Sequence, residues 1–299
     1  MAFKASKTRS IKKTPIAEGR ILIPSAPARE WYETQLKGMI DLMAGDYLAE
    51  IEGVFGTKGV RQHFAMDAKL PVDRIASMFE RLAKRWMPKI AKWSQKTAEQ
   101  MALKINKHSF VTVGESLRTM GIKEPADISK SDFDLRMESF IAQNVALIKS
   151  VPTEMHSKIE RAVWNSLTAP KGTEQGIFGI KAAVQDVTSS EFSRAKFIAQ
   201  DQNAKLYSAL NIARQEQNGV MSFIWMHSSA GKTPRKCHQA WDGRRFATKG
   251  GQNELYEILP DGTLKKYEVG QDGAREADLG KPGFPPKCRC RAKPYIDLD

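Results

Sequence analysis

Hydrophobic positions recur at helical spacing over most of the first 218 residues. Apolar side chains three to five residues apart form one face from Pro27 to Phe55. A longer stripe runs from Pro71 to Lys107, and Pro88 inside it is predicted to kink the helix, since proline removes a backbone donor. Further helices are predicted at 109–120, at 133–151, from Pro152, from a Thr173 cap, and from a Ser189 or Ser190 cap to Asn218.

The pattern changes from helix to strand at Val220. Residues 220–226 are rich in strand formers, and Pro260-Asp261-Gly262 separates two further short strands. Residues 291–296 form the last predicted strand. The predicted fold class is therefore α+β, with mainly helical N-terminal and stem regions and a small loop-rich β cap at the C-terminus.

Composition shifts divide the chain into three predicted regions. Residues 1–26 are basic and poor in core formers, which is typical of a disordered or partner-docking arm. Within the arm, Ile21-Leu22-Ile23 either adds a strand to another subunit or packs locally. A helical region at 27–125 and a C-terminal domain at 126–299 follow, the latter comprising a helical stem (126–219) and the β cap (220–299).

The overall composition is that of a globular protein without a membrane span. Of 299 residues, 41% are hydrophobic, and no apolar run is long enough to cross a bilayer. The basic N-terminus lacks the apolar segment of a secretory signal. We therefore expect synthesis and folding in a cytoplasm, where an odd number of cysteines causes no difficulty.

Positive charge is concentrated in separate stretches. The net charge is +13, from 47 Lys and Arg against 34 Asp and Glu. Such stretches attract nucleic acid, or else form a solvated surface with a basic tail. The three stretches are residues 1–20, 81–107 and 281–293. Trp86 and Trp93 lie in the second of these, where they either stack on bases or, as is commoner at helical spacing, belong to the core. The candidate nucleic-acid-binding residues are Lys4, Lys7, Arg9, Lys12, Lys13, Arg81, Lys84, Arg85, Lys89, Lys92 and Lys96.

All three cysteines lie near the C-terminus. Cys288 and Cys290 are two residues apart, so in an extended segment their side chains point to the same side. Together with Cys237 and His238 they would make a Cys3His zinc shell. Reduced, buried structural thiols and, in an oxidising medium, a disulfide are the alternatives.

An ordered set of short motifs spans residues 135–296. It begins with Arg194-Ala195 and Ile198-Ala199 in a helix and continues through Gly219-Val220 and a strand ending in Trp225. Then come Arg235 and His238 in an Arg-x-x-His element, the Asp242-Gly243 turn with Phe246, Trp241 before that turn, and a Pro-Pro-x-Cys-Arg-Cys close containing Arg289. This set resembles the phage Mu F-like minor head protein family of tailed bacteriophages. The departures are Lys287, where asparagine is expected, and a long acidic insertion between Asp242 and Cys288.

The resemblance implies a structural role in a virion. It implies a minor head protein that acts in procapsid assembly near the portal, contacts portal, head or scaffold proteins and packaged DNA, and enters the cell with that DNA. The protein would then be made in the host bacterial cytoplasm and carried in the virion, and we expect no enzymatic activity. The alternative is a zinc-stabilised nucleic-acid-processing enzyme or toxin-like domain on a helical stem, with His238 as base, Asp242 as its orienting partner or a metal ligand, and Arg235 on a phosphate.

The acidic insertion predicts a particular construction of the cap. Residues 250–280 are expected to form a peripheral excursion whose acidic side chains lie at the surface and pair with the basic helix or a neighbouring subunit. The small core beneath the Asp242-Gly243 turn would then consist of Trp225, Trp241, Phe246 and Phe284.

Overall fold

The computed structural model describes residues 17–55, 72–168, 177–229 and 234–296. It confirms the α+β fold class, with long helices followed by a small antiparallel sheet. The chain divides into two compact units. The helical unit comprises residues 24–108 and 129–207, and the cap unit comprises the described parts of residues 1–23, 109–128 and 208–299.

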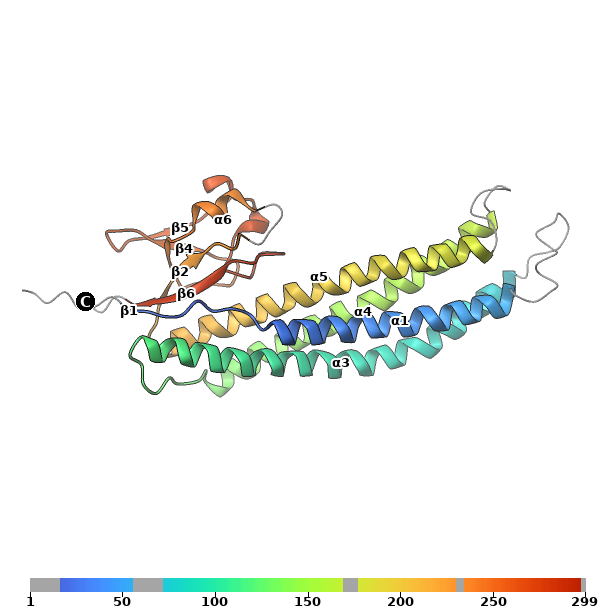
Figure 1. Ribbon diagram of the computed structural model, residues 1–299, viewed down its shortest axis with the longest axis horizontal. Coiled ribbons are helices and arrows are strands. Elements are labelled where there is room, and N and C mark those ends of the chain that lie inside the picture. Colours follow the sequence, from blue (N-terminus) through green and yellow to red (C-terminus); the bar gives the residue numbers. More distant parts are fainter. Residues whose placement is uncertain (1–16, 56–71, 169–176, 230–233, 297–299) are drawn as a thin grey trace, which may run out of the picture. The chain divides into compact units, whose positions relative to one another are not determined.

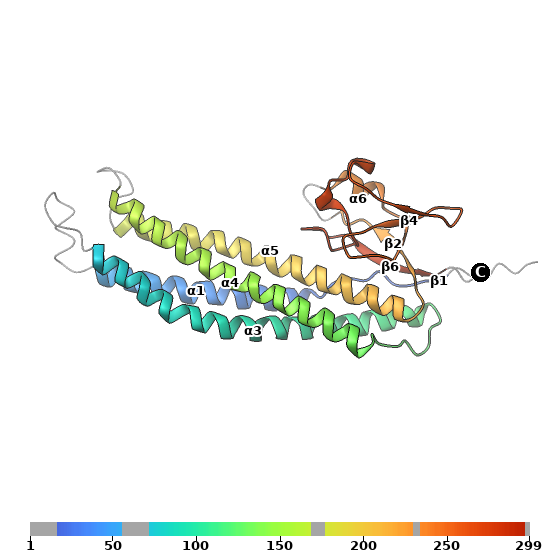
Figure 2. The same cartoon turned by 180° about the vertical axis from the view of Figure 1, so that it is seen from behind.

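Four long helices supply the helical unit: α1 (Ala26–Phe55), α3 (Val72–Thr119), α4 (Lys130–Thr168) and α5 (Ile177–Gln217). Figures 1 and 2 show them running side by side. Asp46 of α1 pairs with Arg85 of α3, and Trp31 lies under Lys104, so α1 and α3 are antiparallel. The apolar stripes face inward, and the buried side chains include Leu36, Ile40, Tyr47, Phe79, Leu82, Ile105, Ile148, Ile159, Val184 and Ile198.

Three predicted helix breaks do not occur. Residues 107–109 lie inside α3, and Pro152 lies inside α4. The predicted Thr173 cap lies outside the described residues, and from Ile177 onward the two helices predicted before Asn218 form the single helix α5. Inside a helix, short hydroxyl side chains can bond a carbonyl one turn back instead of capping. Ser193 does so to the carbonyl of Ser189 at 3.2 Å. Burial of a continuous apolar face outweighs such local signals.

The cap unit is built on a six-stranded antiparallel sheet in the order β1-β6-β2-β3-β4-β5. Its strands are β1 (Ala17–Glu18), β2 (Ser222–Met226), β3 (Arg245–Ala247), β4 (Tyr256–Ile258), β5 (Leu264–Lys266) and β6 (Arg291–Ile296). The predicted Pro260-Asp261-Gly262 hairpin is confirmed between β4 and β5. The short helix α6 (Lys236–Ala240) and the 3-10 turns η1 (Gln271–Gly273) and η2 (Glu276–Asp278) complete the unit.

The compact units do not follow the predicted boundary at 125/126. Helices from both sides of that position share the helical unit, because their apolar faces cover one another. The end of the predicted arm belongs to the cap unit, where β1 pairs with β6 and Leu22 is buried in a bridge to Ala292. Residues 17–23 therefore pack locally in their own chain, and residues 1–16 lie outside the described part.

Residues 250–280 are integral to the cap, so the prediction of a peripheral excursion is wrong. They supply β4 and β5, and they bury Leu255, Tyr267 and Ala274 in the core cluster with Trp225 and Trp241. The acidic side chains of Asp261, Glu268, Asp272 and Glu276 are exposed, as predicted. Others pair within the cap, as Glu254 does with Lys266 at 2.8 Å. A sheet of this size needs extra apolar area, and the insertion provides it.

Candidate metal centre

Three ligand side chains converge in the cap unit: His238, Cys288 and Cys290. His238 lies on α6, which follows β2, and the two cysteines directly precede β6. Because β6 pairs with β2, with Trp225 opposite Ala292, the end of the chain returns to the place where α6 begins. The three ligand atoms all lie within 4.8 Å of one another, and all three residues are buried.

The imidazole faces both sulfurs. His238 Nδ1 lies 3.7 Å from Cys288 Sγ and 3.6 Å from Cys290 Sγ. The prediction that the two cysteines point to the same side is therefore confirmed. One imidazole nitrogen and two thiolates form a donor set that can hold a soft or borderline metal ion.

Cys237 is not part of this group among the described residues, which corrects the predicted four-residue set. Successive residues on a helix are about 100° apart, so the side chains of Cys237 and His238 leave α6 in different directions. The Cys237 side chain is buried in the core cluster of the cap, and this burial raises the pKa of its thiol.

Backbone groups orient the ligands. A carbonyl oxygen can only accept, so His238 donates its Nε2–H to the carbonyl of Asp278, 2.8 Å away, and Nδ1 presents its lone pair to the sulfurs. The amide of Gly283 donates to Cys288 Sγ at 3.4 Å. Such contacts fix the imidazole tautomer and favour a thiolate, which is the form that binds metals.

A hydrogen bond links the two thiol groups and shifts their pKa values in opposite directions. A hydrogen bond from Cys290 holds the pKa of Cys288 well below its ordinary value. The same hydrogen bond, together with burial, raises the pKa of Cys290. A bound cation would displace the remaining proton, because metal ligation requires both thiolates.

Asp278 connects this centre to the predicted motif residue Arg235. Arg235 Nε lies 2.5 Å from the Asp278 carboxylate, which also accepts from Arg275 at 2.9 Å. These guanidinium groups, chiefly Arg275, lower the pKa of Asp278 to about 2. Arg235 also donates to the carbonyl of Pro286 at 2.5 Å, so it ties α6 to the segment before Cys288.

The other motif residues also have structural contacts. The rings of Trp225 and Trp241 lie 5.0 and 5.1 Å from the imidazole of His238, and Phe246 packs against both tryptophans. Gly243 has a φ of 75°, which favours glycine in the turn after Asp242. Phe284 is only half-buried and lies outside the core cluster, whereas Arg289 is exposed between the two buried cysteines.

The geometry does not match the catalytic arrangement considered for His238, Asp242 and Arg235. Asp242 accepts a hydrogen bond from the backbone amide of His227 at 2.7 Å. His238 instead bonds the backbone carbonyl of Asp278, and Arg235 is paired with that residue's carboxylate. The residues proposed as base, orienting group and phosphate ligand therefore take part in turn and core contacts.

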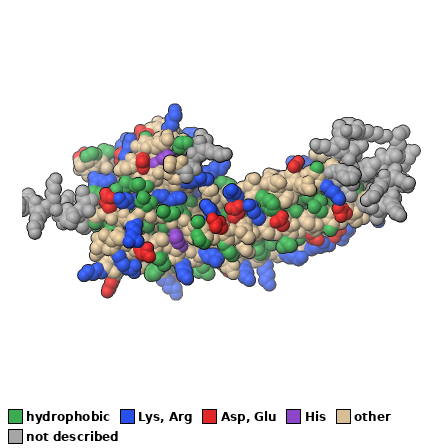
Figure 3. All heavy atoms as spheres, in the orientation of Figure 1, with side chains coloured by type: hydrophobic (Ala, Val, Ile, Leu, Met, Phe, Trp, Pro, Cys, Tyr) green, Lys and Arg blue, Asp and Glu red, His purple; other side chains and the backbone are tan. Residues whose placement is uncertain are grey.

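The predicted nucleic-acid residues of α3 fall into two groups. Arg81, Lys84 and Arg85 form ion pairs, and those of the two arginines are with Asp46 and Glu50 of α1. Figure 3 shows acidic and basic side chains interspersed on the face that it displays. The remaining α3 residues, Lys89, Lys92 and Lys96, are exposed, whereas Lys4, Lys7, Arg9, Lys12 and Lys13 lie outside the described residues.

Sequence reasoning missed two residues of the cap. Asp278 contributes the carbonyl that orients His238, and backbone contacts of this kind leave no signal in the residue type. Lys281 is fully buried, and its ammonium donates to the carbonyls of Ala247 and Lys249 at 3.1 and 2.6 Å. A lysine in a basic stretch is ordinarily assigned to the surface.

Comparison with known proteins supplies little about function. No family model and no solved structure matches the chain. An uncharacterized protein of Haemophilus influenzae (strain ATCC 51907 / DSM 11121 / KW20 / Rd) is 23% identical over 306 aligned residues, covering 99% of this chain and 58% of that protein. The chain thus spans somewhat more than half the length of this relative. Among the described residues, no helix contains an apolar segment long enough to cross a membrane.

Proposed function

We propose that the chain is a minor head protein of a tailed bacteriophage, acting in procapsid assembly near the portal. Its partners are the portal and other head or scaffold proteins, and it contacts packaged DNA and is ejected with it. It is made in the host bacterial cytoplasm and carried in the virion. Its role is structural rather than enzymatic.

One observation carries this proposal: the motif residues that resemble the Mu F-like family meet in one small core. Trp225, Trp241 and Phe246 are buried in the same cluster as Cys288 and Cys290. Arg235 and Asp242 bond backbone or neighbouring groups of the cap. The motif set therefore encodes a fold, which supports a structural protein more than a catalytic one.

We further propose that the ion held by His238, Cys288 and Cys290 is zinc. Thiolate and imidazole ligands suit Zn²⁺, and a small sheet gains stability from an internal metal link. In this assignment His238 Nδ1 and the two sulfurs are the ligands, while the Asp278 carbonyl and the Gly283 amide orient them.

Co-purification tests the head-protein proposal. The tagged chain is isolated from cells producing the phage, and the proposal expects portal protein to be recovered with it and the chain to be present in purified virions. Trp241→Ala, which removes a fully buried side chain from the cap, should lose the portal. Lys84→Gln, which alters only an exposed ion pair at 3.8 Å, is the matched control and should retain it. Absence of portal from the wild-type sample would contradict the proposal.

The second candidate is a nucleic-acid-processing enzyme, and the number of ligands is the observation in its favour. Three protein ligands are typical of catalytic zinc, which keeps a fourth position for water. Cleavage of DNA or RNA by the purified zinc-loaded chain would favour this candidate, provided that Cys288→Ser, which removes a zinc ligand, abolishes the cleavage. An inert zinc-loaded chain would favour the structural role.

A further inference from the structure

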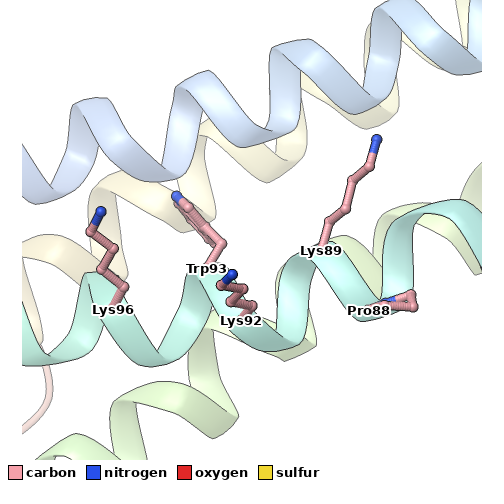
Figure 4. Close-up of a pocket in the computed structure, with 5 residues that line it drawn as sticks. All are labelled: Pro88, Lys89, Lys92, Trp93 and Lys96. Atoms are coloured by element: carbon pink, nitrogen blue, oxygen red, sulfur yellow. The ribbon is translucent and has the colours of Figure 1, made fainter.

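An open pocket of about 500 Å³ lies on α3 in the helical unit. It is lined by Pro88, Lys89, Lys92, Trp93 and Lys96. These residues recur at three- and four-residue spacing, so they share one face of the helix. Figure 4 shows Lys89, Trp93 and Lys96 pointing to the same side of α3, with Lys92 beside Trp93.

The lysines of this pocket differ from the other basic residues of α3. Arg81 and Arg85 are neutralised by Asp46 and Glu50. In the described part of the chain, no carboxylate forms an ion pair with Lys89, Lys92 or Lys96. The pocket therefore carries three positive charges on a face about 10 Å long, at 1.5 Å per residue from 89 to 96.

The two tryptophans of the helix also differ. Trp86 is buried, and its indole N–H donates to Asp46 at 2.9 Å, so it belongs to the core. Trp93 is only half-buried, and its side chain lines the pocket. Lys89 lies over the ring of Trp86, with Nζ 5.1 Å from the ring centroid, and within the described residues none of the three lysines has a carboxylate partner. A partly exposed aromatic ring between such lysines combines a stacking surface with charges complementary to phosphate.

We propose that this pocket binds single-stranded nucleic acid, with a base stacked on Trp93 and the flanking phosphates contacted by Lys89, Lys92 and Lys96. A single strand is the occupant because its bases expose their faces, whereas those of a duplex are already stacked on one another. The inference goes beyond the DNA contact of the proposed function. Oligonucleotide binding is measured on the purified protein and portal binding in cells. Either experiment can therefore fail while the other succeeds.

Fluorescence anisotropy of a labelled oligothymidylate of about ten nucleotides measures the binding. Trp93→Leu should weaken it by about 5- to 150-fold, corresponding to about 1–3 kcal/mol for stacking of one base. Trp93→Phe should retain most of the affinity, since it keeps an aromatic face. Replacing Lys89, Lys92 and Lys96 together with Gln should make the slope of log K against log salt shallower by about 2.

Two matched controls address general charge and tryptophan effects. Lys84→Gln removes one positive charge from the same helix but from an ion pair with Glu80, and it should leave affinity nearly unchanged. Trp31→Leu removes another half-buried tryptophan that lies under a lysine, at 4.9 Å from Lys104 Nζ to the ring centroid, and it should also have little effect. Circular dichroism confirms folding of each variant, and if Trp93→Leu unfolds, Trp93→Phe and the lysine variant carry the test.

Competing ligands separate the possible occupants. Binding of the oligonucleotide in preference to a duplex of equal length and to free thymidine triphosphate supports the proposal. Equal or tighter binding of the triphosphate would assign the pocket to a free nucleotide and overturn it. Affinity that is unchanged in Trp93→Leu, or equally reduced in Lys84→Gln, would also overturn it.

Discussion

His238 donates its Nε2–H to the backbone carbonyl of Asp278, and the two atoms lie 2.8 Å apart. This hydrogen bond selects the tautomer with the proton on Nε2, so that the lone pair of Nδ1 faces the sulfurs of Cys288 and Cys290. It also joins α6 to the end of the acidic insertion. The same contact therefore prepares the metal centre and makes residues 250–280 part of the cap.

The first prediction concerns the ligand set. Protein purified under reducing conditions should contain about one zinc ion per chain by elemental analysis. Cys288→Ser and Cys290→Ser should lose the metal, whereas Cys237→Ser should retain it, because Cys237 lies outside the cluster. At a free zinc concentration about a thousandfold above Kd, the ion should add about 4 kcal/mol to the free energy of unfolding, so a chelator should lower Tm.

The cysteine variants serve as controls for one another, because each replaces one buried thiol with a hydroxyl. Equal loss of zinc in all three variants would show that Cys237 is also a zinc ligand. Well under one zinc ion per wild-type chain, with no effect of chelator on Tm, would contradict a metal centre.

The second prediction concerns the acidic insertion. Replacing residues 250–280 with a short Gly-Ser linker should unfold the cap, because Leu255 and Tyr267 would leave its core and His238 would lose the Asp278 carbonyl. Near-ultraviolet circular dichroism and limited proteolysis would detect the loss. Inserting two glycines beside Gly262, in an exposed turn, is the control and should change stability little, since loop-closure entropy rises slowly with length. If the deletion variant still folded, residues 250–280 would be peripheral to the cap and this prediction would be wrong.

A third prediction concerns Trp241, which is fully buried between the rings of Trp225, His238 and Tyr267. Trp241→Ala should lower the free energy of unfolding of the cap by about 3–5 kcal/mol, as expected for removal of a large buried aromatic side chain. Trp241→Phe is the milder control, since it keeps a ring but loses the N–H bond to Asp272 at 3.1 Å. Urea denaturation followed by near-ultraviolet circular dichroism measures both, and equal stability of the Ala variant and wild type would contradict this core.

Local patterns predicted the elements better than their connections. Periodic apolar positions predicted α1 to within one residue, and strand formers predicted β6 with its bounds. Pro152 was read as a helix start because that position favours proline, yet it lies inside α4, where long-range packing decides. The pairing of cysteines with His238 could be inferred from residue type, but the exclusion of Cys237 depends on side-chain direction around α6. Burial of the insertion depends on sheet pairing that its acidic composition conceals.

The fourth prediction concerns the basic arm. Replacing Lys4, Lys7, Arg9, Lys12 and Lys13 with Gln should weaken sequence-independent binding of duplex DNA and reduce the salt slope by up to about 4.5, at about 0.9 per phosphate contact. Replacement is preferable to removal of the first 20 residues, because Ala17 and Glu18 form β1 of the sheet. An arm of the same composition in scrambled order should bind like wild type, since phosphate contacts do not depend on order. Unchanged binding after charge removal would show that the arm does not contact DNA.

The last prediction concerns Lys281 and stability at alkaline pH. Burial lowers the pKa of its ammonium from 10.5 to about 8, against the opposing influence of Glu216 and Glu254. Below pH 8 the group is protonated in both the folded and the unfolded chain, so the cost of burying the charge is fully present. Between about pH 8 and pH 10.5 the unfolded chain holds the proton and the folded chain releases it, so this group makes stability rise with pH, by about 3 kcal/mol in total. Lys281→Met lacks this group, and the free energy of unfolding of wild type minus that of the variant should therefore increase across this window. Urea denaturation of both proteins at several pH values measures that difference, and other alkaline titrations cancel in it. A difference that stays constant would show that Lys281 keeps an ordinary pKa in the folded protein, and one that falls would show a raised pKa; in either case its hydrogen bonds to the carbonyls of Ala247 and Lys249 would offset the cost of burial.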